Sequence, residues 1–404
     1  MLKISGISLI YFCLGMLSTA HFKFFGNVNY NEVTYIGILL CFFWGAVFLA
    51  QRILPFEYSI QSPCRLRLLL YFMLFFIVAV SVFALFRFGP SPVVGVLIGA
   101  DAGSLLLHGS YREQLPLRAV APPVAIATAI FTYIAYRKRS VSVIFGIIVA
   151  CALIFFVSVY ETRHVLIWIF FYIIGIEISS IGLNNLLSSA FRNWKLGASL
   201  MLLFFIFKLF GEIRSGLDGY LEDAGPVFAE GMGVDEEYWQ IGLTLLWVVI
   251  YGFSSFARGM ENDPFYSLFD FVLPEKLFPG PLQFLVYGSR PSSGLMQDRF
   301  SGQMFAVDAW HTYSLNFGVL GAVIFVNFVF ITLFILSVVM FQKLKNSGTV
   351  PYYLFFILLW LSARIYLFPF GDYLLDFAAG VELLLLLLVA RITGFRIWYR
   401  VLRA

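Results

Sequence analysis

The chain has 404 residues, of which 61% are hydrophobic and only 12% are charged, and its formal net charge is +4. A soluble globular domain is about a quarter charged, so this composition, with a mean hydropathy of +0.89, excludes that class. Several apolar runs reach about 18 residues or more, which is enough to cross a bilayer core. The sequence therefore predicts a polytopic membrane protein.

The first apolar run, from Ile4 to Ala20, has no small-residue cleavage site and is followed by many similar runs. We therefore expect it to be a first span rather than a removed signal peptide. The predicted fold class is an all-α polytopic membrane protein with about ten transmembrane helices. These helices are expected at 4–22, 33–51, 68–87, 119–136, 141–160, 165–187, 196–212, 317–341, 351–370 and 373–391.

Three regions follow from these spans. Residues 1–212 form an N-terminal transmembrane bundle, and residues 317–404 form the C-terminal helices and a basic tail. Between them lies a large external loop, 213–316, rich in Gly, Pro, Trp, Tyr and charge. Loops of this length are usually functional or disordered, and its many aromatic residues argue against disorder.

Basic residues fix the predicted orientation. With the N-terminus inside, the inner segments hold fifteen of the 27 Lys and Arg residues and one acid, Glu57. This asymmetry is the positive-inside signature, so both termini are predicted to be cytoplasmic. The inner basic residues are Lys3, Arg52, Arg65, Arg67, Arg137, Lys138, Arg139, Arg192, Lys195, Lys343, Lys345, Arg391, Arg396, Arg400 and Arg403.

One apolar segment, Trp239–Ala257, does not fit this scheme, because a single crossing there would place His311 in the cytoplasm. Either the segment lies in the interface or re-enters without crossing, or Phe265–Tyr287 crosses back. The second segment carries Asp270, Glu275 and prolines, which are costly within a bilayer. We therefore expect re-entrant or interfacial helices within the external loop.

Several chemistries are not indicated. The chain has no phosphate-binding GxxxxGK[ST], no HExxH, no Cys/His cluster, and no close pair of aspartates in its external loops. Its four cysteines do not suggest a disulfide framework. We expect no cofactor, no metal and no nucleic-acid partner.

Four arginines in the external loop are candidates for binding phosphate. Guanidinium groups bind phosphate oxygens in a planar, bidentate way and keep their charge at all working pH values. Two of these residues end apolar segments, near the level where a lipid-linked phosphate would lie. The alternative is that such arginines anchor helix ends by extending toward the interface. The four are Arg214, Arg258, Arg290 and Arg299.

The stretch WHTYSLNFGVLG, from Trp310 to Gly321, joins the external loop to an apolar run. His311 has an ordinary pKa of about 6.5, so it can accept a proton from a hydroxyl or donate a hydrogen bond to a phosphate. Asp308 and Asp298 are the competing bases. An interfacial histidine bonded to a carbonyl is the alternative.

Two further charges, Glu177 and Arg364, lie inside apolar runs. Charged residues within a membrane are functional candidates by default, and a structural ion pair within the bundle is the alternative.

The topology and two short motifs resemble those of the bacterial O-antigen polymerases, the Wzy-type oligosaccharide repeat-unit polymerases. The resemblance is carried by Arg214 after the helix entering the loop, by YGFSSFARGMENDP, and by the Gly318-x-x-Gly321 junction. Where those polymerases often have Asp-Phe-Gly-x-x-Gly, this chain has Asn316. It is similar, more distantly, to the O-antigen ligases.

The resemblance implies a metal-independent membrane glycosyltransferase of the inner membrane, with 213–316 as its periplasmic active-site loop. The substrate would be a glycan on undecaprenyl pyrophosphate, and a chain-length regulator protein is a possible partner. His311, or Asp308 in its place, would act in catalysis, and the four loop arginines would bind pyrophosphate. The alternatives are ligase-type transfer to another lipid acceptor and a lipid-linked glycan flippase or exporter.

Overall fold

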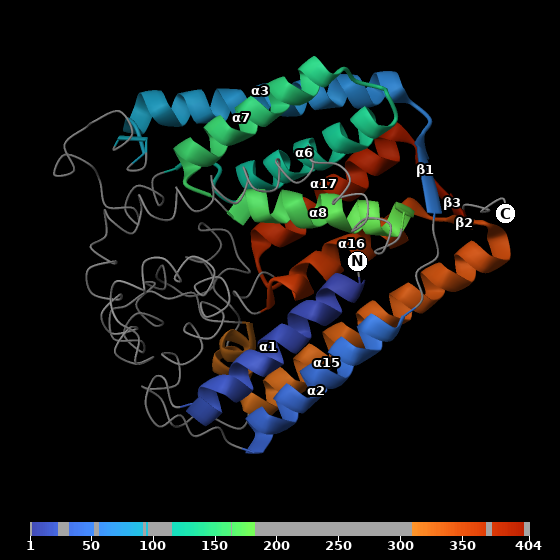
Figure 1. The fold of residues 1–404 in the computed structure, drawn as a ribbon. Helices are drawn as coiled ribbons and strands as arrows, with labels where there is room; N and C mark the ends of the chain where they lie inside the picture. Colours follow the sequence, from blue (N-terminus) through green and yellow to red (C-terminus); the bar gives the residue numbers. More distant parts are fainter. Residues whose placement is uncertain are drawn as a thin grey trace, which may run out of the picture. The chain divides into compact units, whose positions relative to one another are not determined.

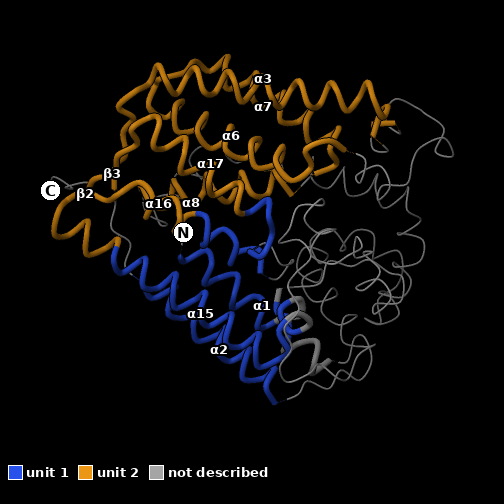
Figure 2. Tube along the Cα trace, turned by 180° about the vertical axis from the view of Figure 1, so that it is seen from behind, with its two compact units in different colours: residues 1–52, 224–339, 360–379 blue, residues 53–223, 340–359, 380–404 orange. Residues whose placement is uncertain are grey.

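The computed structural model describes residues 2–22, 32–51, 56–91, 94–95, 115–162, 164–181, 309–368 and 374–399, and helices dominate it (Figure 1). The chain divides into two compact units, each gathered from segments far apart in sequence (Figure 2). Unit 1 comprises Met1–Arg52, Ala224–Val339 and Trp360–Ala379, and unit 2 comprises Ile53–Asp223, Met340–Leu359 and Gly380–Ala404.

Every predicted span is occupied by a helix, apart from 196–212, which lies outside the described residues. The helices are α1 (Leu2–Phe22), α2 (Glu32–Ala50), α3 (Pro63–Phe88), α6 (Ala121–Arg137), α7 (Val143–Tyr160), α8 (His164–Ile181), α15 (Ala309–Ser347), α16 (Tyr352–Tyr366) and α17 (Phe377–Thr393).

Four of the described helices are long and apolar enough to cross a membrane: Glu32–Ala50, Pro63–Phe88, Val143–Tyr160 and Phe317–Ser347. Their outer faces are also suited to lipid. On α15, Ile324, Phe328, Ile331 and Ile335 recur at helical spacing and are all exposed. On α3, Phe72, Phe75 and Phe86 are 67%, 71% and 86% exposed. Apolar surface of this extent fits a bilayer environment. The full count of about ten crossings stays a prediction.

In unit 1, α1 and α2 cross closely because two glycines meet at their contact. A Cβ on Gly6 would lie 2.7 Å from the carbonyl oxygen of Gly45, so position 6 has no room for a larger residue without a shift of the helices, and a Cβ on Gly45 would lie 3.1 Å from the carbonyl oxygen of Gly6. The thiol of Cys13 then donates to the carbonyl oxygen of Ile38 at 3.3 Å. The indole Nε1 of Trp44 donates to Asn327 Oδ1 at 2.9 Å, which ties α2 to α15.

In unit 2, α6 is the central helix and packs against α3, α7 and α8. All of its residues are buried except Tyr133, Tyr136 and Arg137 at its C-terminal end. Five alanines among its seventeen residues let the neighbouring helices approach closely. The buried length of the helix thus carries no charge and only two hydroxyls, those of Thr128 and Thr132, and its charged residue, Arg137, lies at the end that meets a small sheet.

The sheet has three antiparallel strands in the order β1-β3-β2: β1 (Phe56–Ile60), β2 (Thr349–Val350) and β3 (Phe395–Tyr399) (Figure 1). Phe56 pairs with Tyr399 and Ile60 with Phe395, while Thr349 pairs with Trp398. The prediction of an all-α fold omitted this sheet. Its strands belong to three segments predicted to share one side of the membrane, and the structure brings these three segments together.

Candidate functional site

The polar junction near His311 is a short helix of its own. Regular helix geometry fails inside α15 at Gly318, where φ is 73° and ψ is 167°. This break separates residues 309–317 from the long helix that continues to Ser347. The predicted loop of 213–316 therefore ends in a helical segment, and the apolar helix runs beyond its predicted end at 341.

A physical constraint explains why each of the two positions in the junction is glycine. The φ and ψ of Gly318 fall in a region that is accessible essentially to glycine alone. At Gly321, a Cβ would lie 2.8 Å from the Cβ of Phe317, so only glycine lets Phe317 pack over the first turn of the long helix. The Gly-x-x-Gly motif thus permits a sharp turn between two helices.

One face of the short helix is packed into unit 1. Trp310, Tyr313 and Ser314 are 2%, 3% and 3% exposed. The hydroxyl of Ser314 donates to the carbonyl oxygen of Trp310 at 2.9 Å. The ring of Tyr313 lies 4.8 Å from that of Phe325 and 6.3 Å from that of Phe368, between ring centroids.

His311 belongs to this short helix, although its side chain is not among those described. At about 100° per residue, its position on the helix is about 100° from that of Trp310 and about 60° from that of Ser314. The other predicted site residues, Asp308, Arg214, Arg258, Arg290 and Arg299, lie outside the described residues, as does Asp298. Their association with His311 stays a prediction.

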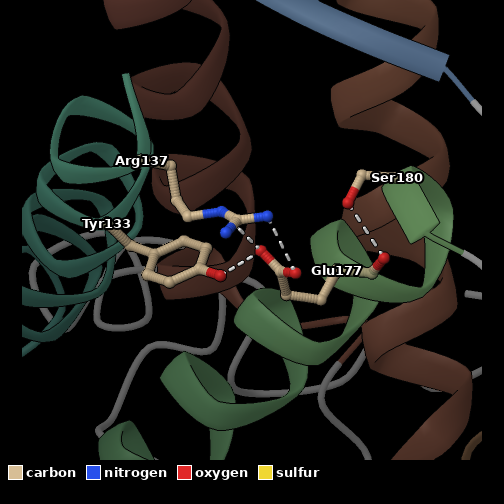
Figure 3. Close-up of polar contacts among 4 residues, drawn as sticks. All are labelled: Tyr133, Arg137, Glu177 and Ser180. Atoms are coloured by element: carbon tan, nitrogen blue, oxygen red, sulfur yellow. Dashed lines mark hydrogen bonds and ion pairs between the residues drawn. The ribbon is translucent and has the colours of Figure 1, made fainter. Parts of the chain in front are cut away.

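Glu177 is held by partners from α6, as Figure 3 shows. The guanidinium of Arg137 approaches both carboxylate oxygens: Nε lies 3.0 Å from Oε1, and Nη2 lies 3.2 Å from Oε2. The phenol of Tyr133 also donates to Oε1. The Glu177 side chain is 13% exposed and that of Arg137 is 45% exposed. The sequence analysis left Glu177 as either a functional residue or part of a structural ion pair. In the structure its ion pair connects α8 to the end of α6.

The same cluster continues to the sheet. The ammonium of Lys138 lies 4.7 Å from the centroid of the Tyr58 ring, a cation–π contact between the end of α6 and β1. Burial raises the pKa of the Tyr58 phenol, and Glu177 adds to this effect while Arg137 opposes it. The cluster therefore joins α6, α8 and β1 at one end of unit 2.

Two more charges lie within apolar helices. Arg364, predicted as a candidate, is 7% exposed, and its guanidinium lies 5.7 Å from the ring centroid of Trp360. Glu382 of α17, which the sequence analysis did not single out, is 2% exposed and accepts a hydrogen bond from Tyr172 of α8. A lone acid in the run VELLLLLLV was the signal that would have identified it.

Among the described residues, no three His, Cys, Asp or Glu side chains gather in the manner of metal ligands. No protein-family model, no curated protein and no solved structure matches the chain.

The turn at Gly318 gives a testable prediction. Gly318→Ala and Gly318→Asn should each lower the free energy of unfolding by about 1–3 kcal/mol, because neither residue adopts this backbone conformation without strain. Gly348, at the C-terminal end of α15 with a φ of 66° and no atom within 4 Å of a built Cβ, is the matched control. Gly348→Asn should cost much less, because Asn tolerates positive φ at helix ends. Thermal unfolding in detergent measures both, and equal losses at the two sites would contradict the assignment.

The pair of Arg137 and Glu177 gives a second prediction. A double-mutant cycle of Arg137→Met and Glu177→Gln should show a coupling of about 1 kcal/mol or less, because solvent screens the partly exposed Arg137. Arg65→Met, at an exposed position in the first turn of α3, removes the same charge and is the control. If Arg65→Met and Glu177→Gln show equal coupling, the effect is one of overall charge and not of the ion pair.

Proposed function

We propose that this chain polymerises undecaprenyl-pyrophosphate-linked oligosaccharide repeat units, of the O-antigen kind, at the periplasmic face of the bacterial inner membrane. The observation that carries this proposal is the turn at Gly318. There the helix of residues 309–317 passes directly into the long helix that makes up nearly all of the 31-residue membrane-span candidate Phe317–Ser347. This arrangement supports a position for His311 near the level of lipid head groups, where a lipid-linked phosphate meets its sugar.

In the proposed reaction, an acceptor hydroxyl attacks the anomeric carbon of the donor glycan. The bond from that carbon to the pyrophosphate oxygen breaks, and undecaprenyl pyrophosphate leaves with the bonding electrons. The hydroxyl proton passes to a base, for which His311 is the first candidate and Asp308 the second, and in the other role of His311 its imidazole contacts the phosphate. Arg214, Arg258, Arg290 and Arg299 would stabilise the charge that develops on the leaving group. The pyrophosphate already activates the donor, so the reaction needs no nucleotide.

The proposed orientation places the sheet of unit 2 in the cytoplasm. Its strands follow α2, α15 and α17 in the chain and belong to basic segments. The contact of Lys138 with Tyr58 places the basic end of α6 beside these segments as well. The positive-inside rule then makes this the inner side, with both termini cytoplasmic.

The same arrangement bears on the segment Trp239–Ala257. Helix α8 contacts β1, and its Glu177 meets Arg137, so α8 ends on the side of the sheet. The helix Phe317–Ser347 leads into β2, so the proposed topology has this helix start on the other side of the membrane. In that topology the connection between them changes sides through one crossing, proposed at 196–212. A second crossing by Trp239–Ala257 alone would undo it. Both segments lie outside the described residues.

Two other functions remain as alternatives. A ligase would share the donor and the chemistry but would transfer the glycan to a different lipid acceptor. A flippase or exporter would place ionisable groups along its membrane helices. The buried contact of Glu382 with Tyr172 favours that second class, because both residues lie within predicted spans of unit 2.

The proposed function is tested with purified protein and lipid-linked repeat units. The wild-type chain should extend them into longer glycans without nucleotide, and a deletion strain should lose the long rungs of its lipopolysaccharide ladder. Transfer only to a lipid A-type acceptor would identify a ligase. Movement of the substrate across vesicles without extension would identify a flippase and overturn the proposal.

The role of His311 is a third prediction, and its two possible roles predict opposite pH profiles. A general base must be neutral, so activity should rise with pH through the histidine pKa and then level off. A cationic phosphate contact must be protonated, so activity should fall over the same range.

His311→Gln separates these roles further, because Gln donates a hydrogen bond but cannot shuttle a proton. We expect Gln to retain much of the activity that Ala loses, as a phosphate contact requires. A loss on the order of a hundredfold in both variants would indicate a base instead. The measurement is glycan extension over about pH 5.5 to 8.5, which brackets an ordinary histidine. Full activity in both variants would remove His311 from the site.

The orientation gives a fourth prediction, measured in a variant without native cysteines. A cysteine at position 292 should react with an impermeant thiol reagent in cells with a permeabilised outer membrane. Cys64 restored alone is the control, because it is exposed on the side of the sheet and should be protected. The reverse pattern would overturn both the orientation and the proposed periplasmic site.

A further inference from the structure

The indole of Trp310 occupies a notch in α2 that exists only because residue 37 is glycine. A Cβ built on Gly37 would lie 1.9 Å from Cη2 of Trp310, 2.4 Å from Cζ2 and 2.6 Å from Cζ3. Real Cβ atoms essentially never come within 3.0 Å of another heavy atom. Position 37 and the Trp310 ring therefore compete for the same space, and any side chain at 37 must displace the ring.

The notch itself lies in a well-fixed part of unit 1. The residue after Gly37, Ile38, accepts a hydrogen bond from the Cys13 thiol of α1, and its side chain is 2% exposed. Two turns further along α2, Trp44 ties the helix to the long part of α15 by its hydrogen bond to Asn327. A ring seated on Gly37 is thus attached to α1, α2 and the membrane-crossing part of α15 together.

Such an attachment is needed because Gly318 breaks the continuity of α15. The backbone of the long helix cannot dictate the direction of residues 309–317 across a turn of this kind. The direction must come from side-chain contacts, and Trp310 and Tyr313 provide them on the buried face. Of the two, Trp310 adjoins His311 in sequence and occupies the space that a Cβ on Gly37 would take.

We propose that Trp310 is a positioning residue, seated on Gly37, which fixes the helix of residues 309–317 and thereby the place of His311. The effect of Trp310 on catalysis rests on the proposed function. The packing of its ring against Gly37 does not. Neither residue touches substrate in this proposal. A small rotation of the short helix would move His311 away from the reacting atoms, and displacements of about 1 Å can cost a hundredfold in rate.

The test is a pair of substitutions that should compensate each other. Gly37→Ala inserts a methyl group where the far edge of the indole lies, so extension activity should fall about tenfold or more, mainly in kcat. Trp310→Phe shortens the ring and vacates that space, at a smaller cost. Combining the two should restore activity to the level of Trp310→Phe alone. Gly146→Ala, in a helix where nothing lies within 4 Å of the built Cβ, is the control and should be silent.

A second readout does not depend on glycan chemistry. A cysteine at position 312, in a variant without native cysteines, reports the placement of the short helix through its rate of reaction with an impermeant thiol reagent. Gly37→Ala should change this rate, and adding Trp310→Phe should return it toward the original value. If the wild-type chain extends no glycan, the proposed function fails, and these labelling rates still decide whether Trp310 is seated on Gly37.

If Gly37→Ala alone does not accumulate, the methyl group is introduced in a Trp310→Ala background. There it should change neither labelling nor activity, because the ring it would displace is gone. Equal labelling rates and activities in the wild type and Gly37→Ala would overturn the proposal. So would a double variant with Trp310→Phe that is no better than Gly37→Ala alone.

Discussion

The backbone conformation of Gly318 governs what the rest of the candidate site can be. With φ at 73° and ψ at 167°, this residue ends one helix and starts another inside a single continuous stretch of 39 residues. A straight helix would carry the polar residues around His311 along the axis of the membrane span. The turn instead lets one face of a short helix pack on unit 1, with Trp310 against Gly37. Site geometry and membrane crossing are therefore set by separate contacts.

Charged side chains within the apolar helices are stabilised by contacts with neighbouring side chains. Glu177 binds Arg137 and Tyr133 where α6 ends, and Arg364 lies over the ring of Trp360. Contacts of this kind lower the cost of placing a charge away from water, which is large when a charge has no partner. For Glu177 the structural explanation is sufficient, because its pairing joins α8 to α6 beside β1. Glu382, which accepts a hydrogen bond from Tyr172, is a second acid within the apolar helices of unit 2.

The sequence predicted the helices well because apolar runs of bilayer length are long signals. The described helices fall on the predicted spans. Their ends differ little in α1, α2, α6 and α7, by several residues at one end of α3, α16 and α17, and most in α15. The sheet could not be found in the same way, because its longest strands have only five residues. In β3, buried Phe395 and Ile397 alternate with exposed Arg396, a pattern too short to stand out beside a basic tail. The pairing of β1 with β3, which are more than three hundred residues apart, gives no signal in the sequence near either strand.

For the site, the sequence located the junction but not the means by which it is held. His311, the glycine pair and the change from polar to apolar residues were all visible in one dozen residues. The role of Gly37 was not visible in the sequence. Glycine is common within membrane spans, and nothing near it in the sequence indicates that it contacts Trp310. Only the fold shows that its missing side chain makes room for Trp310. In the proposed function, the reacting groups must keep fixed positions at the edge of a fluid bilayer. An aromatic ring locked into a helix of the bundle achieves this without a charge that lipid would penalise.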